Sequence, residues 1–247
     1  MQLETESDLL TEILLRVSCG DLRRCRCVCA AWRDTVDRAW FWRRRCQREN
    51  IGHSTTPSDW RAHYLLCRYR RNLVANPSAG SGLLGWAFEE WPPGFEAQCM
   101  REGERGAPAE VACFVSRDTN CSMTQTVDLV CSGYSREALD AVRPALAVSW
   151  WYFIPTRDPW CDYRVQIRLR SETGATVERF DAVVNVWSMG DHTWHDAAHV
   201  FREYRAGVRY VEIGHTVCYY DFDAETYSGM RVTRSAVEVL SPWAHVE

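Results

Sequence analysis

The stretch Tyr163–Arg170 reads Tyr-Arg-Val-Gln-Ile-Arg-Leu-Arg and decides the fold of most of the chain. Apolar and polar residues alternate strictly in it, and this pattern predicts an antiparallel strand with one buried face and one wet face. The same alternation returns at Val208–Tyr210 and Val237–Val239, with turn signals at Glu172–Gly174 and Arg205–Gly207. Several such strands from about residue 83 onward predict a mainly antiparallel β-sandwich or jelly roll.

The first 70 residues carry a different, helical period. An acidic helix start at Thr5–Asp8 is followed by apolar residues at three-to-four spacing, and a second stripe runs from Leu22 to Val36 as one helix capped by Asp21. Further helices are expected at 39–47 and from Asp59 to about residue 71. Helices this short make a small core, so part of their apolar surface should face another protein.

The two patterns meet at Asn76-Pro77, after which Gly and Pro residues are frequent. We therefore predict an α+β chain with helical residues 1–50, a helical linker at 51–76 and a β-sandwich at 77–247. Residues 1–76 carry 14 Arg and 9 acidic residues (+5), and the rest carry 15 Arg and 24 acidic residues (−9). Two surfaces with different partners are expected, and the basic excess is too small to favour nucleic acid.

Composition also bears on compartment and modification. The 12 Cys follow no signal-peptide pattern, which favours a reducing, cytoplasmic location, and the longest apolar run, Ala145–Ile154, is too short for a membrane span. All 29 basic residues are Arg, so no side-chain amine is present for ubiquitination, acetylation or Schiff-base chemistry. Codon bias explains this as well as selection against such modification does.

Candidate chemical sites are weak. The group Asp191, His192, His195 and His199 has zinc-binding residue types, but on a strand His195 and His199 stand too far apart to share one ion. The segment Cys25-x-Cys27-x-Cys29 has spacing too short for a zinc module. No nucleophile motif and no phosphate-binding loop in a strand–helix context occurs, so we expect no catalytic residues, metal or cofactor.

The N-terminal helices resemble an F-box. The matching elements are Leu9-Leu10-x-x-Ile13-Leu14, Asp21-Leu22, Cys27-Val28-Cys29-x-x-Trp32 and Trp40-Phe41-Trp42. The resemblance implies docking to the small Skp-type adaptor of a cullin ubiquitin ligase. The residues it assigns to that contact are Leu9, Leu10, Ile13, Leu14, Leu22, Val28, Cys29, Trp32 and Trp42. The chain departs from the family by lacking the two usual Leu-Pro pairs.

The remainder resembles the F-box-associated domain of the sugar-binding subfamily of F-box proteins. The matching segments are Asp59–Arg61, Arg71–Pro77, Val127–Leu129, Gly133-Tyr134, Arg143–Ala145, Cys161-x-Tyr163, Gly207–Val211 and Gly229–Thr233. This resemblance implies a jelly-roll-like, galactose-binding-like sandwich whose loops at one end hold a protein target, which in that subfamily carries N-linked glycans.

The residues expected to hold a sugar differ from the subfamily. Its Tyr-Trp-Lys positions are occupied here by Asp223-Ala224-Glu225, and an earlier Phe falls near Asp118. Ala and Glu supply neither an aromatic plane nor a cation for a sugar ring. The candidate target-binding loop consists of Tyr219, Tyr220, Phe222, Ala224, Glu225 and Tyr227. Its aromatics either form a substitute platform or are ordinary core residues.

These observations favour the substrate-recognition subunit of a Skp–cullin–F-box ligase, a non-catalytic adaptor acting in protein degradation, with glycoprotein catabolism and endoplasmic-reticulum-associated degradation as the finer expectation. The alternative is a lectin-like or protein-binding module that no longer docks to a ligase. A hydrolase is disfavoured because no nucleophile is evident.

Overall fold

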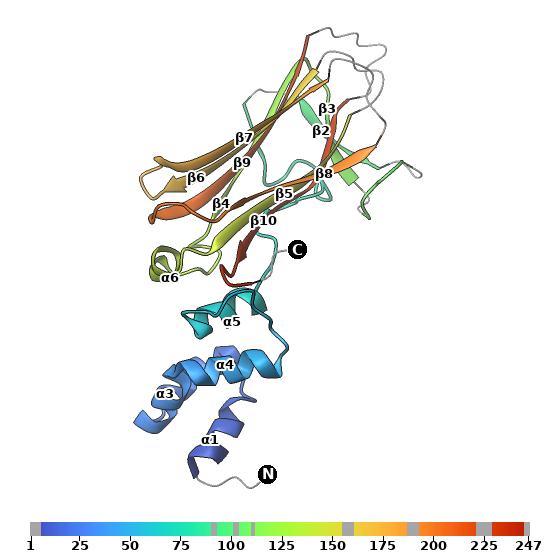
Figure 1. Cartoon of the computed structure of the whole chain (residues 1–247). Coiled ribbons are helices and arrows are strands. Elements are labelled where there is room, and N and C mark those ends of the chain that lie inside the picture. Colours follow the sequence, from blue (N-terminus) through green and yellow to red (C-terminus); the bar gives the residue numbers. More distant parts are fainter. Residues whose placement is uncertain are drawn as a thin grey trace. The chain divides into compact units, whose positions relative to one another are not determined.

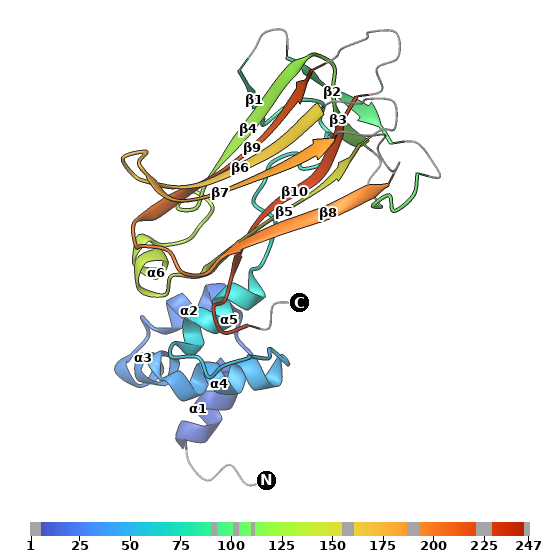
Figure 2. The same ribbon diagram turned by 45° about the horizontal axis from the view of Figure 1, so that its top comes forward.

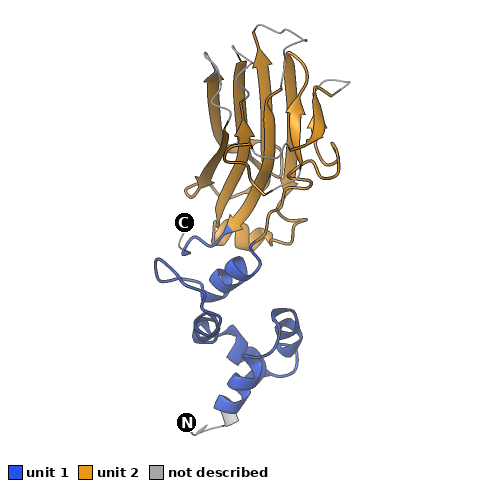
Figure 3. Cartoon of the chain, turned by 90° about the vertical axis from the view of Figure 1, so that its right-hand side faces the viewer, with its two compact units in different colours: residues 1–70, 240–247 blue, residues 71–239 orange. Residues whose placement is uncertain are grey.

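The computed structural model describes residues 6–89, 93–100, 104–109, 112–154, 161–186, 193–220 and 229–244. The chain divides into two compact units, a helical unit of residues 1–70 with 240–247 and a sandwich unit of residues 71–239 (Figure 3). The sequence places the boundary after residue 76 and assigns the C-terminal residues to the sandwich. In the structure, residues 71–76 belong to the sandwich unit and residues 240–247 to the helical unit.

The described residues of the helical unit form five helices: α1 Glu6–Leu14, α2 Cys19–Cys25, α3 Ala30–Asp37, α4 Ala39–Arg48 and α5 Trp60–Arg68. The apolar stripe predicted as one helix is broken into α2 and α3, with Cys29 extended before α3. Ser18 caps α2 by accepting a hydrogen bond from the backbone N–H of Asp21 at 3.2 Å. The core of the unit includes Leu14, Leu22, Phe41, Trp42 and Tyr64.

The C-terminal residues complete the helical unit. His63 on α5 is fully buried, and its Nδ1 lies 2.7 Å from Oγ of Ser241. The backbone N–H of Ser54 donates to the carbonyl of Trp243 at 2.8 Å. Burial lowers the pKa of His63, which favours its neutral form. Ser241 and Trp243 are therefore structural parts of the helical unit.

In the part of the sandwich unit that the structure describes, the strands form two five-stranded sheets (Figures 1 and 2). The first has the order β1-β4-β9-β6-β7 and the second β2-β3-β10-β5-β8. The strands are β1 Ala87–Phe88, β2 Phe95–Cys99, β3 Ala112–Ser116, β4 Asn120–Asp128, β5 Ala145–Phe153, β6 Cys161–Ser171, β7 Thr176–Val186, β8 Trp194–Phe201, β9 Val208–Tyr219 and β10 Arg231–Leu240. The predicted antiparallel sandwich preceded by short helices is confirmed.

Strand β6 shows why the alternation specifies this fold. Tyr163, Val165, Ile167 and Leu169 are all buried, while the Arg and Gln residues between them are more accessible. On the neighbouring β9, His215 accompanies this apolar row; its Nδ1 lies 2.8 Å from the Tyr163 hydroxyl. Its Nε2 lies 3.1 Å from Oγ of Ser235 in the other sheet. Burial lowers the pKa of His215 to about 3, so a neutral imidazole links the two layers at physiological pH.

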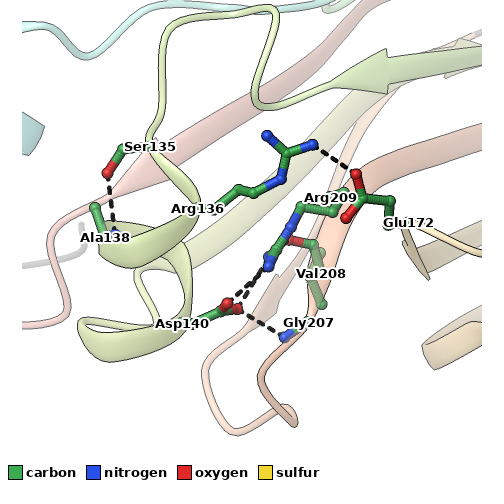
Figure 4. Close-up of polar contacts among 8 residues, drawn as sticks. All are labelled: Ser135, Arg136, Ala138, Asp140, Glu172, Gly207, Val208 and Arg209. Carbon is green, nitrogen blue, oxygen red and sulfur yellow. Dashed lines mark hydrogen bonds and ion pairs between the residues drawn. The ribbon is translucent and has the colours of Figure 1, made fainter.

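A short helix, α6 Arg136–Ala141, lies at the same end of the sandwich as the β6–β7 turn (Figure 1). The carboxylate of Asp140 accepts hydrogen bonds from the Gly207 backbone at 2.8 Å and from Nη1 and Nη2 of Arg209 at 2.9 and 2.7 Å (Figure 4). Arg136 pairs with Glu172 at 2.5 Å in the same view. This helix is fastened to β9 by a bidentate ion pair.

Candidate functional site

The helical unit exposes a set of large apolar side chains on α1, α4 and the segment between α2 and α3. Leu9 and Ile13 lie one turn apart on α1, and each is about half exposed, 49% for Ile13. Val28 and Trp40 are also exposed large apolar residues, and Cys29 is exposed beside Val28. Exposed apolar side chains are typical of protein-binding sites, so this set is the candidate docking surface of the unit.

The nine residues assigned to adaptor contact separate into three groups in the structure. Leu9, Ile13, Val28 and Cys29 are exposed, whereas Leu10 and Trp32 are half-buried and pack against the core. The three others, Leu14, Leu22 and Trp42, are buried in the core of the helical unit.

The contacts of Trp42 explain why this residue is buried. Its indole Nε1 donates to the buried Val36 carbonyl at 2.7 Å, and its ring packs 5.4 Å from that of Tyr64. Trp40, two residues earlier, takes the exposed position instead. Trp40 is an exposed residue of α4 that the adaptor-contact prediction omits.

The candidate target-binding loop begins where β9 ends. Tyr219 is buried, and its hydroxyl accepts from the Met230 backbone N–H at 3.0 Å and lies 3.2 Å from Oγ of Ser116. Of the two alternatives that the sequence left open for this residue, a substitute sugar platform or an ordinary core aromatic, Tyr219 is the core aromatic. Phe222, Ala224, Glu225 and Tyr227 lie outside the described residues.

Tyr220 has the opposite environment. Its side chain is 63% exposed, and its hydroxyl donates to Oδ2 of Asp162 at 2.7 Å. The same carboxylate oxygen accepts from Nη2 of Arg164 at 3.0 Å. The Tyr220 and Arg164 hydrogen bonds lower the pKa of Asp162, and the partner carboxylate raises the pKa of Tyr220. An exposed ring is therefore held in place by a buried, ionised acid.

A second group of polar contacts joins Glu104 to the first residues of β10 and β8. Glu104 forms an ion pair with the buried Arg231 and accepts from the indole Nε1 of Trp194 at 2.8 Å. The Arg231 guanidinium lies 5.0 Å from the centre of the Phe153 ring. Arg231 is the Arg of the Gly229–Thr233 segment, and the sequence alone does not indicate which residue it pairs with. Here it fixes the segment at Glu104 against β8 and β10.

The two histidines of this group that the structure describes, His195 and His199, stack on different aromatic rings. His199 stacks on Phe180 with ring centres 3.9 Å apart, and His195 stacks on Tyr152 at 5.2 Å. Asp191 and His192 lie outside the described residues. Within the described ranges, His, Cys, Asp and Glu side chains form no group of three suited to a metal ion. No helix among those residues is long and apolar enough to cross a bilayer.

Comparison with known proteins identifies both units. Residues 7–44 match the F-box domain family, and residues 64–239 match the F-box associated region. The chain belongs to the F-box proteins with an F-box associated region. This confirms the family predicted from the sequence.

Relatives of this family align over nearly the whole chain. F-box only protein 6 of Bos taurus is 33% identical over 94% of this chain and 90% of its own length. F-box only protein 2 of Bos taurus is 31% identical, covering 96% of this chain and 83% of its own. F-box only protein 44 of Homo sapiens is 30% identical, covering 97% and 96%.

Solved structures similar to the sandwich include a carbohydrate-binding module in complex with β-1,4-galactotriose and a family 16 carbohydrate-binding module. The first has a TM-score of 0.44 and 13% identity and covers 68% of this chain and 97% of its own. The second has a TM-score of 0.39 and 15% identity and covers 67% and 99%.

Proposed function

We propose that this protein is the substrate-recognition subunit of a Skp–cullin–F-box ubiquitin ligase in the cytoplasm. The observation that carries the proposal is the exposed apolar set of the F-box, Leu9, Ile13, Val28 and Trp40, which lies outside the buried core of the helical unit. Burial of these side chains by a Skp-type adaptor would link the chain to a cullin, and the sandwich would hold the target.

Such a subunit acts by proximity. It makes and breaks no bonds, but it raises the effective concentration of a target amine beside the ubiquitin thioester. The F-box associated region supplies the target-binding surface in this proposal. The finer expectation of an N-glycosylated target is weakened, because Ala224 and Glu225 stand where the sugar-binding subfamily has Trp and Lys. Glycoproteins with high-mannose chains should therefore bind weakly.

The decisive test is Ile13→Asp with Leu84→Asp as its matched control. Both positions are exposed and apolar, and Leu84 is 73% exposed in the sandwich unit. A charge placed within an apolar docking surface typically costs ~2 kcal/mol or more, so adaptor affinity should fall about 30-fold or more in Ile13→Asp. Leu84→Asp should bind the adaptor like the wild type. The measurement is titration of purified adaptor by calorimetry.

Equal adaptor binding by Ile13→Asp and wild type would show that the docking surface is misassigned. The absence of the Leu-Pro pairs favours an alternative function, a lectin-like or protein-binding module that does not dock to a ligase. Failure of the wild-type chain itself to bind the adaptor would support that alternative.

A further inference from the structure

The exposed Tyr220 ring, with Asp162 and Arg164, forms a small surface that has no role in the core. Tyr220 directly follows β9, at the start of the connection to β10, and its side chain is exposed. Its hydroxyl is fixed by a carboxylate that is only 5% exposed, so the ring has little freedom to lose when a partner covers it. Rigid aromatic side chains of this kind are typical anchors of binding surfaces.

The hydrogen-bonding state of this cluster discriminates between ligand classes. A sugar bound at an aromatic ring needs donors and acceptors beside the ring for its hydroxyl groups. Here the Tyr220 hydroxyl is already donated to Asp162, and the accepting oxygen also holds Arg164. The Tyr220 hydroxyl therefore cannot donate to a sugar without losing its bond to Asp162, whereas an apolar side chain can cover the ring without breaking either bond.

Charge gives a second, independent indication. Residues 77–247 carry 15 Arg and 24 acidic residues, a net charge of −9. A unit with a net negative charge attracts a basic partner and speeds its association, but it offers no such attraction to a neutral glycan. Arg164 is itself neutralised by Asp162, so it adds no net positive charge at the ring.

We propose that Tyr220 is a target-contact residue for a basic polypeptide segment, which places an apolar or aromatic side chain on the Tyr220 ring. The proposal rests on the proposed function, since it names the chemistry of the target held by the F-box associated region. Recognition is then directed at the polypeptide and does not depend on glycosylation.

The test uses the full chain and two named probes, a phage-displayed library of random 12-residue peptides and an array of N-linked glycans. We expect enrichment of peptides that combine Arg or Lys with a large apolar residue, and affinities that fall with added salt. In Tyr220→Ala, the selected peptides should bind about 30-fold more weakly. Tyr220→Phe keeps the ring but loses the bond to Asp162, so it should bind the peptides more weakly than the wild type and more tightly than Tyr220→Ala.

The matched control is Tyr69→Ala, which removes another exposed Tyr, 47% exposed, from the helical unit. It should bind the selected peptides like the wild type, and calorimetric adaptor binding should be unchanged in Tyr220→Ala, which separates this proposal from the docking proposal. The inference is overturned if selected peptides bind Tyr220→Ala as tightly as wild type, or if no basic peptide is enriched. Glycan binding that is lost in Tyr220→Ala would also overturn it, by assigning the ring to a sugar.

Discussion

Replacing Asp140 with Ala tests how strongly α6 is held to β9. The change removes the acceptor of three hydrogen bonds and leaves Arg209, whose guanidinium is almost buried, with only the Val208 carbonyl at 2.8 Å (Figure 4). Charged hydrogen bonds contribute ~1.5–3 kcal/mol each, but Asp140 is 38% exposed and water replaces part of the loss. We expect a loss of about 2 kcal/mol in the free energy of unfolding of the sandwich unit.

For a unit of this size, that loss lowers the Tm by ~4–8 °C. Urea denaturation and thermal scans of the full chain measure it, with Glu172→Ala as the control. That control removes only the exposed Arg136–Glu172 pair, and no resolved change is expected. Equal effects of the two substitutions would refute the reasoning, because they would show that the bidentate geometry and burial of Arg209 contribute nothing.

The same pair predicts a pH dependence. The Arg209 hydrogen bonds hold the pKa of Asp140 below its ordinary value. The stabilisation is therefore fully present above the usual Asp pKa of ~3.9 and is lost as the pH falls through the lower folded-state pKa. The stability difference between wild type and Asp140→Ala should be constant near neutral pH and disappear in acid.

Two further substitutions give sharp expectations. Gly229→Ala should destabilise the sandwich by ~2 kcal/mol or more, because φ is +74° and the added Cβ would lie 2.5 Å from the Ser116 carbonyl oxygen. Its control is Gly82→Ala, where φ is +65° and the space around the added Cβ is open. In the same denaturation assay, Gly82→Ala should lower the free energy of unfolding by clearly less. Arg24→Lys, at a side chain 87% exposed, introduces the amine that the chain lacks; in reconstituted ligase, mass spectrometry should find ubiquitin at residue 24 of the variant and at no side-chain amine of the wild type.

The strands were the most predictable part of the fold. Residues 163–170 specify β6 because each buried face of a strand requires an apolar residue at every second position. Helix α6, with six residues, is too short to show a helical period, so its sequence predicts no element. The contact between His63 and Ser241 joins residues 178 positions apart, and no local pattern encodes it.

The two candidate surfaces share a feature that sequence patterns do not resolve. In each, an exposed apolar residue is the direct neighbour of a buried one: Ile13 beside Leu14, and Tyr220 beside Tyr219. Neighbouring residues point in different directions on a helix and to opposite faces of a strand, so packing alone decides which member faces outward. The buried member fixes the backbone, and the exposed member is then presented rigidly.

This pairing decides how substitutions at either surface must be interpreted. Leu14→Asp places an unpaired carboxylate in the core of the helical unit and would abolish adaptor binding by unfolding that unit, whatever the adaptor contacts. A loss of target binding in Tyr219→Ala would be ambiguous in the same way, because Tyr219 accepts from the Met230 backbone. Function is reported by Ile13 and Tyr220, whose side chains can be changed without opening a cavity.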